Sequence, residues 1–272
     1  MSEFIKHNGI IEASGITKEK VTKGEITVVK VGGSTYQERA KVIADVATLH
    51  KSGIPLVLVH GGGAEIDDSL HSAGIVPVKI DGKRVTDART LEIVVEVLDC
   101  INGQITDQLE RLDVPCVGFT SDHGILQAEI DDPKYGLVGG VLDVDNEALK
   151  IAITMDVIPV VCPIATQKAN RLQKLNVNAD TAAGAVAASL LKSRLLLLTD
   201  VPGVLDENGA VVNELNTIDY ALLRQRGVIG AGMIPKIDSC LPVIKAGGNA
   251  LICHSSDLRA AFGTSPKGTV IK

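Results

Sequence analysis

Apolar residues occur along the chain in blocks whose spacing switches between that of strands and that of helices. A mostly apolar run over 27–31 predicts a buried strand that ends in two glycines, and 39–50 follows with the apolar spacing of a helix. The run over 55–60, followed by three glycines and a helical pattern over 65–73, repeats this order. Two successive units of strand, glycine turn and helix predict a parallel sheet with helices on its faces.

The remaining segments extend this pattern. Further strands are expected over 114–119, 158–162, 194–198 and 250–253, and helices over 90–111, 145–155, 180–191 and 236–246. Alternating flanks around an Asp-Asp-Pro turn in 127–142 predict a hairpin outside the parallel sheet. The polar segment 167–174 is the best candidate for a boundary between two lobes, and residues 1–25 are expected to form a weakly structured extension.

Composition argues against several classes of protein. The 27 Lys and Arg against 33 Asp and Glu give a net charge of −6, which disfavours general nucleic-acid binding. Three Phe, three Tyr and no Trp leave little from which to build surfaces that stack on bases or sugars. The five cysteines form no Cys-x-x-Cys pair, which disfavours a zinc site or a disulfide framework and favours a reducing cytoplasm. No apolar run has the length of a signal peptide or a membrane span, so we expect a cytoplasmic protein without membrane contact.

The two glycine turns are the first candidates for ligand binding. They follow parallel strands, whose carboxyl ends gather along one edge of the sheet, and glycine lets backbone N–H groups approach an anion closely. Neither turn matches a P-loop or a G-x-G-x-x-G fingerprint, which disfavours P-loop nucleotidases and dinucleotide dehydrogenases. A phosphate cradle and a tight structural turn therefore remain equal alternatives at this point.

Two lysines could serve the same anion. Lys30 lies in an otherwise apolar strand, where burial without an anionic partner is costly, although a residue at the sheet edge could also reach water. Lys236 lies where a glycine-rich loop enters a helix through Pro235; a solvated lysine is the simpler interpretation, but its charge opposes the helix dipole.

Other polar residues lie near expected element ends. Asp180 precedes an alanine-rich helix, so its simplest role is an N-cap, whereas Asn176 could offer a ligand both donors and acceptors. Asp200 follows an apolar strand and by itself indicates only a loop at the same sheet edge. Arg84, in a short loop before a helix, is suited to clamp a carboxylate, although most arginines in loops are solvated.

Together these segments resemble the amino acid kinase superfamily and, within it, the acetylglutamate kinase family, over about residues 26–272. The resemblance rests on six segments in the family's order: Val29-Lys30-Val-Gly32-Gly33, Val59-His60-Gly61-Gly62-Gly63, Gly82-Lys-Arg84-Val-Thr-Asp87, Leu175-Asn176-Val-Asn178-Ala-Asp180, Leu198-Thr-Asp200-Val-Pro-Gly203-Val and Gly232-Met-Ile-Pro-Lys236. The Arg-Val-Thr-Asp, Asn-Val-Asn-Ala-Asp and Gly-Met-Ile-Pro-Lys segments are the most specific to this branch.

The resemblance implies an α/β protein of two lobes, a three-layer αβα sandwich with a mainly parallel central sheet. The lobe 26–170 would bind the acyl amino acid and carry the interface of a homodimer or higher oligomer, and the lobe 171–272 would bind ATP with Mg²⁺. The implied catalytic residues are Lys30, Lys236 and Asp180, with the aspartate holding both lysines. The implied substrate-binding residues are Gly62, Gly63, Arg84 and Asn176. The implied nucleotide-binding residues are Gly32, Gly33, Asp200, Gly203 and Gly232, and no residue is assigned to a metal.

The implied reaction is phosphorylation of the side-chain carboxylate of N-acetyl-L-glutamate in arginine biosynthesis. A carboxylate acceptor is ionised at neutral pH and needs no general base, which agrees with the lack of a Ser/His/Asp or Cys/His arrangement. Two alternatives stay open: a kinase of a related acylated or carrier-linked glutamate or aminoadipate in lysine biosynthesis, and a sensor that binds amino acids or nucleotides without catalysis.

Overall fold

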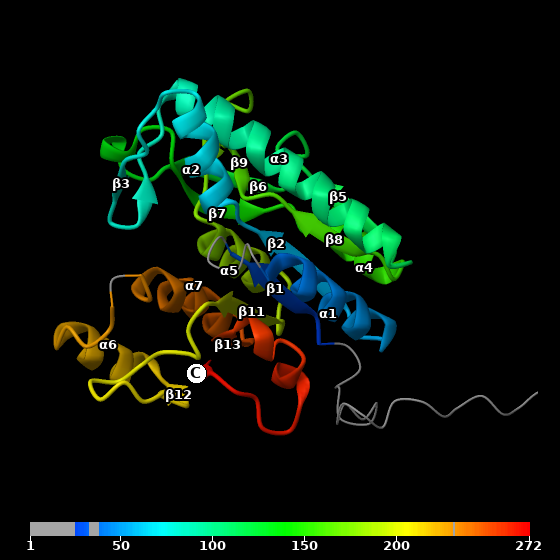
Figure 1. Cartoon of the computed structure of the whole chain (residues 1–272), viewed down its shortest axis with the longest axis vertical. Coiled ribbons are helices and arrows are strands. Elements are labelled where there is room, and N and C mark those ends of the chain that lie inside the picture. Colours follow the sequence, from blue (N-terminus) through cyan, green and yellow to red (C-terminus); the bar gives the residue numbers. More distant parts are fainter. Residues whose placement is uncertain (1–24, 33–37, 231) are drawn as a thin grey trace, which may run out of the picture.

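The computed structural model describes residues 25–32, 38–230 and 232–272, so Gly33 and the expected extension up to residue 24 lie outside the described residues. Its largest sheet has eight strands in the order β12-β14-β13-β11-β1-β2-β8-β5 (Figure 1). These strands are Glu214–Leu215, Thr269–Ile271, Asn249–His254, Arg194–Thr199, Thr27–Val31, Leu56–His60, Ile158–Val161 and Cys116–Phe119, in that order. Neighbouring strands run parallel except β13 and β14. The prediction of a mainly parallel sheet is confirmed.

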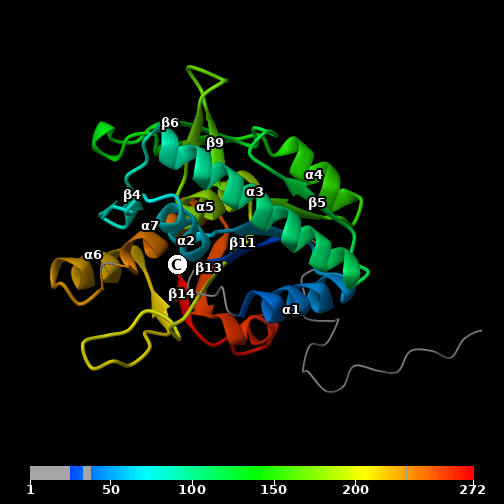
Figure 2. The same ribbon diagram turned by 45° about the horizontal axis from the view of Figure 1, so that its top comes forward.

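Helices cover both faces of this sheet. They are α1 (Arg39–Lys51), α2 (Gly63–Ser72), α3 (Ala88–Arg111), α4 (Glu147–Thr154), α5 (Ala179–Ser189), α6 (Thr217–Gln225) and α7 (Ile234–Lys245), with short 3₁₀ helices at Pro133–Tyr135, Ser255–Asp257 and Ala260–Phe262. Helices α1 and α3 lie side by side (Figure 2), where the Gln108 side chain donates to the carbonyl of Ala40 over 2.9 Å. No helix in the described part of the chain is long and apolar enough to cross a membrane.

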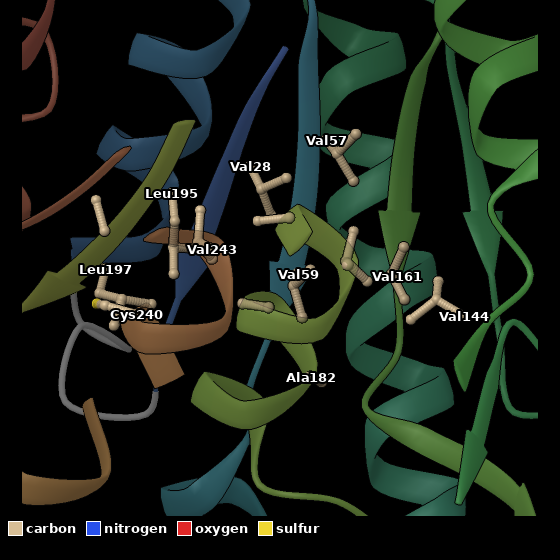
Figure 3. Packing of buried hydrophobic residues seen from close by; sticks show 14 of the residues in the cluster. Val28, Val57, Val59, Val144, Val161, Ala182, Leu195, Leu197, Cys240 and Val243 are labelled. Carbon is tan, nitrogen blue, oxygen red and sulfur yellow. The ribbon is translucent and has the colours of Figure 1, made fainter. Parts of the chain in front are cut away.

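Side chains of the sheet alternate between its two faces, as the pleat requires. Those of Val28, Val59 and Leu197 pack toward α5 and α7, where Figure 3 shows them with Ala182 and Cys240. The alternate residues of the same strands point to the other face of the sheet. There they form a second apolar cluster with α1 and α3, whose members include Val29, Leu58, Leu196, Ile43 and Ile105. The sheet is thus buried on both faces, which confirms the three-layer αβα architecture.

A smaller sheet lies beside the large one, in the order β10-β9-β6-β7. Its strands are Lys174–Asn176, Ile164–Gln167, Leu126–Ile130 and Gly139–Val144. Strands β6 and β7 pair antiparallel, which confirms the hairpin expected over 127–142. The segment 167–174 joins β9 to β10, which also pair antiparallel, so it is a hairpin turn within this sheet. The division into lobes 26–170 and 171–272 stays a prediction.

Most expected elements of the large sheet and its covering helices are confirmed with small shifts at their ends. The sequence pattern does not predict the short strands β3 (Lys79–Ile80) and β4 (Lys83–Arg84), which form a two-stranded hairpin, nor β9, β10, β12, β14 and α6. These strands are two to four residues long, too short to show a periodic pattern.

Close contact between α5 and α7 depends on a glycine. A Cβ atom at Gly184 of α5 would overlap the carbonyl oxygen of Ser239 in α7. By contrast, Gly103 of α3 has no atom within 4 Å of the place a Cβ would take. The two helical glycines therefore differ in the space around them, although both lower intrinsic helix propensity.

We expect Gly184→Ala to destabilise the protein by about 1–3 kcal/mol, because α5 and α7 would have to separate. The matched variant Gly103→Ala is expected to raise the free energy of unfolding by about 0.5–1 kcal/mol, since alanine favours the helix and meets no neighbour. Denaturant unfolding of both variants measures this difference. Equal stability of the two variants would contradict the close packing of α5 on α7.

Candidate active site

Lys30 is directed by strand alternation toward the face of the sheet covered by α5. It lies two residues after Val28, which packs on that face, and it pairs in register with Leu197 and Val59 on the neighbouring strands. Only 5% of the residue is exposed. An ammonium group at this depth needs an anionic partner.

That partner is Asp180, in the first turn of α5. The cap of this helix is Asn178, whose side-chain oxygen accepts the backbone N–H groups of Asp180 at 2.8 Å and Thr181 at 3.3 Å. The prediction that Asp180 caps the helix is therefore wrong. Because Asn178 takes that role, the carboxylate of Asp180 is left for other contacts, and the helix dipole favours its charge.

The Asp180 carboxylate binds two lysines, one at each oxygen. Lys30 Nζ lies 2.8 Å from Oδ1, and Lys236 Nζ lies 3.0 Å from Oδ2. Lys236 reaches this position from the start of α7, where Pro235 occupies the first turn. The structure thus brings together all three predicted catalytic residues, from elements far apart in the sequence. We call these three residues the lysine–aspartate cluster.

The pKa values of the cluster follow from one buried anion between two cations. Burial raises the pKa of Asp180, but the charges and hydrogen bonds of Lys30 and Lys236 outweigh it and lower that pKa to about 2. Burial, together with the like charge of Lys236, lowers the pKa of Lys30 below its usual value, although the charge and hydrogen bond of Asp180 act in the other direction. With all three groups ionised the cluster carries one excess positive charge, which favours a bound anion.

A cavity of about 240 Å³ opens beside this cluster. Its lining includes the predicted residues Lys30, Asp180, Gly62, Gly63, Arg84 and Asn176. The structure therefore places every predicted substrate-binding residue at the same cavity as Lys30 and Asp180.

Gly62 and Gly63 lie where β2 ends and α2 begins. A Cβ atom at Gly62 would lie 2.5 Å from Ile101 and 3.0 Å from Leu98, both on α3. The turn therefore needs a glycine for packing. Gly63 has open space where a Cβ would stand, so packing does not explain it. Backbone N–H groups at such a helix start are suited to bind anions.

Arg84 lies in β4 and is almost fully buried. Its Nη1 lies 2.5 Å from Asp67 Oδ1, and its Nη2 donates to the carbonyl of Gly63 over 3.2 Å. Lys79 binds the other oxygen of Asp67 at 2.8 Å. Asp67 is not among the residues predicted from the sequence, where the available signal is an aspartate one turn into the helix that follows a glycine turn. Asn176 donates to the hydroxyl of Thr86 over 3.1 Å.

The described residues that are predicted to bind nucleotide, Gly32, Asp200, Gly203 and Gly232, lie outside the cavity lining. Asp200 follows β11, and the register of β11 with β1 puts it at the same sheet edge as Gly32. A Cβ atom at Gly32 would overlap Lys30 Nζ, so glycine there leaves room for the ammonium group.

Gly203 packs on Thr269, whose Oγ1 would lie 2.7 Å from a Cβ atom placed on the glycine. Gly232 precedes α7. Nucleotide contact by these residues stays a prediction, and Gly33 lies outside the described residues.

Among the residues that the structure describes, no group of three or more His, Cys, Asp or Glu side chains could hold a metal ion. The carboxylate that lines the cavity, Asp180, is bound by two lysines. The open cavity presents ammonium groups, backbone N–H groups and a guanidinium along its wall, and these groups can stabilise a bound anion electrostatically.

Comparisons with known proteins show the family of this chain. A model of the amino acid kinase family matches residues 25–254. Acetylglutamate kinase from Campylobacter fetus is 37% identical over 262 residues, which covers 92% of this chain and 92% of that protein. Acetylglutamate kinase from Rhizobium etli is 39% identical over 238 residues, which covers 81% of this chain and 80% of that protein.

Solved structures show the same fold. A Streptococcus mutans protein superposes with a TM-score of 0.78 at 30% identity, covering 91% of this chain and 98% of that one. A carbamate kinase from Giardia superposes with a TM-score of 0.70 at 16% identity, covering 92% and 99%, and this second likeness supports the fold alone. The chain belongs to the amino acid kinase family and, within it, to the acetylglutamate kinases.

Proposed function

We propose that this protein transfers the γ-phosphoryl group of ATP to the side-chain carboxylate of N-acetyl-L-glutamate, the acyl-phosphate-forming step of arginine biosynthesis. The observation that carries the proposal is the lysine–aspartate cluster, of which Lys30 and Asp180 line a cavity together with Arg84 and a glycine turn. The names of the relatives supply the substrate, and the kinase family supplies ATP.

The reaction needs charge neutralisation more than proton transfer. A carboxylate oxygen of the substrate attacks the γ-phosphorus, the bond from that phosphorus to the bridging oxygen of ADP breaks, and the products are an acyl phosphate and ADP. The acceptor is already ionised near pH 7, so no group must remove a proton. Lys30 and Lys236 neutralise the oxygens of the phosphoryl group in transfer, while Asp180 holds both ammonium groups in place.

The residues proposed to bind the substrate all line the cavity. Arg84 binds the α-carboxylate of the acyl amino acid, Asn176 binds its acylated amino end, and Gly62 and Gly63 donate backbone N–H groups. Because Asp67 already holds Arg84, the guanidinium is fixed before the substrate arrives. On the nucleotide side we propose Gly32, Gly33, Asp200, Gly203 and Gly232.

Mg²⁺ enters this proposal with the nucleotide. Mg²⁺ keeps several water ligands and binds readily to phosphate oxygens, so it needs no dedicated carboxylate cage in the protein. When bound to ATP it neutralises part of the phosphate charge. We also propose that the chain forms two lobes, 26–170 and 171–272, that it assembles as a homodimer or higher oligomer, and that it is located in the cytoplasm.

The proposal is tested by trapping the acyl phosphate with hydroxylamine. We expect ATP-dependent product with N-acetyl-L-glutamate, and none with free glutamate, aspartate or N-acetyl-aminoadipate. Product with N-acetyl-aminoadipate instead would support the kinase of lysine biosynthesis. If MgATP raises the melting temperature but no acceptor is phosphorylated, a non-catalytic sensor or a carrier-linked substrate replaces the proposal.

Replacing Lys30 by methionine keeps the length of the side chain but removes its charge. We expect kcat of Lys30→Met to fall about 100-fold or more, the usual effect of losing one preorganised charge at the transition state. The control is Lys51→Met at the exposed end of α1, which should retain wild-type kcat. Steady-state ADP release measures both, and a Lys30→Met enzyme with near-normal kcat would remove Lys30 from the mechanism.

Arg84→Gln tests the carboxylate clamp. Loss of a charged hydrogen-bond donor should raise KM for N-acetyl-L-glutamate about 10- to 100-fold while kcat changes less, because Arg84 binds ground and transition states alike. Arg111→Gln, at the exposed end of α3, is the matched control. A fall in kcat with unchanged KM would show that Arg84 does not anchor the substrate.

A further inference from the structure

His60 is a buried histidine that the proposed reaction does not use. Strand alternation directs Val59 toward α5 and therefore His60 toward α3, on the opposite face of the sheet from Lys30. The residue is fully buried, and it ends β2 immediately before the glycine turn. A buried imidazole at this place needs hydrogen-bond partners for both ring nitrogens.

Asn102 of α3 supplies one partner. Its Nδ2 lies 3.1 Å from His60 Nε2 and 2.9 Å from the carbonyl oxygen of Val160. Since a carbonyl oxygen can only accept, the nitrogen of the Asn102 amide faces Val160, and the same NH₂ group donates to His60. A Cβ atom at Gly118 would overlap Asn102 Oδ1, so the glycine of β5 leaves space for this amide.

The Asn102 contact determines the tautomer of His60. Because Nε2 accepts, the proton of a neutral ring is on Nδ1, which lies 3.2 Å from the carbonyl oxygen of Gly61 and donates to it. Burial lowers the pKa of His60 to about 4, with a further lowering by Arg39, while the Gly61 carbonyl and Asp99 act in the other direction. The ring is therefore neutral near pH 7.

The bond to Gly61 orients the next peptide group. The N–H of Gly61 donates to the carbonyl of Val31 over 2.8 Å, so this residue is held at both its N–H and its C=O. In a trans peptide the C=O and the following N–H point in opposite directions. A Gly61 carbonyl held by the His60 ring therefore directs the N–H of Gly62 away from that ring. The position of a Cβ atom on Gly62 faces Leu98 and Ile101 of α3.

We infer that His60 and Asn102 are positioning residues that aim the N–H of Gly62 into the cavity, where the phosphoryl oxygens are stabilised. This inference rests on the proposed function, in which Gly62 is one of the donors. A donor that is already oriented needs no reorganisation during the reaction, which is why such groups stabilise transition states strongly. Asn102 acts only through His60, because its amide contacts the ring and Val160 and not the cavity.

A matched pair of variants tests this role. Asparagine and leucine have nearly the same shape, and both would lose the ring and its contact with Asn102. Only His60→Asn keeps a donor where Nδ1 stands. We expect His60→Leu to lower kcat about 10- to 100-fold more than His60→Asn, with KM for N-acetyl-L-glutamate nearly equal in the two.

A merely structural role for His60 predicts equal kcat in the two variants, and that result would overturn the inference. The double variant His60→Leu with Asn102→Leu should have about the same kcat as His60→Leu alone, since Asn102 acts through the ring. Additive losses would show that Asn102 acts independently and would also count against the inference.

A spectroscopic measurement separates this inference from the proposed function. In protein labelled with ¹⁵N-histidine, the ring of His60 should give the signals of a neutral tautomer protonated on Nδ1 near pH 7. A charged ring, or a proton on Nε2, would overturn the inference whatever the activity. The expected tautomer in a protein that forms no acyl phosphate would leave the hydrogen-bond chain intact and refute the proposed function alone.

Discussion

One buried carboxylate held between two buried ammonium groups is the constraint on which the rest of the site depends. Removing water from three charges is costly, and the structure compensates for this with contacts of 2.8 and 3.0 Å from Asp180 to Lys30 and Lys236. Those contacts join β1, α5 and α7, so the positions of three separate elements are coupled to one set of charges. The remaining positive charge has no partner within the cluster, and an anionic substrate can supply one.

Because successive side chains of a strand point to opposite faces, residues at the same sheet edge lie in two different environments. Lys30 on β1 faces α5 and meets charge, whereas His60 on the neighbouring β2 faces α3 and meets a neutral amide. The glycine turn after His60 lines the same cavity as Lys30. Its N–H groups can therefore be oriented from the α3 side by uncharged hydrogen bonds while the opposite side remains electropositive. A charged histidine next to the turn would need its own anion. Burial lowers the pKa of His60 to about 4, so the ring is neutral.

Sequence alone predicted the parts of the fold that are long and periodic, and the residues whose type conflicts with their surroundings. A lysine in an otherwise apolar strand is unusual, and this feature predicts that Lys30 binds an anion. The cap of α5 was assigned to Asp180 and not to Asn178, because both residues are good caps and only the backbone shows where the helix begins. The pairs Asp67–Arg84 and His60–Asn102 could not be predicted, since each joins residues that only the tertiary fold brings together.

The glycines of the site show why functional and structural explanations need not compete. At Gly32 a side chain would occupy the space of the Lys30 ammonium, and at Gly62 it would displace the side chains of Leu98 and Ile101 on α3, so packing favours glycine at both positions. The same lack of a side chain leaves the backbone of the turn accessible to an anion. Gly63 lacks any such neighbour, so the space that it leaves at the cavity is the simpler reason for a glycine there. The turn thus combines a glycine required by the core with one that the core does not require, and the second is the better indicator of ligand binding.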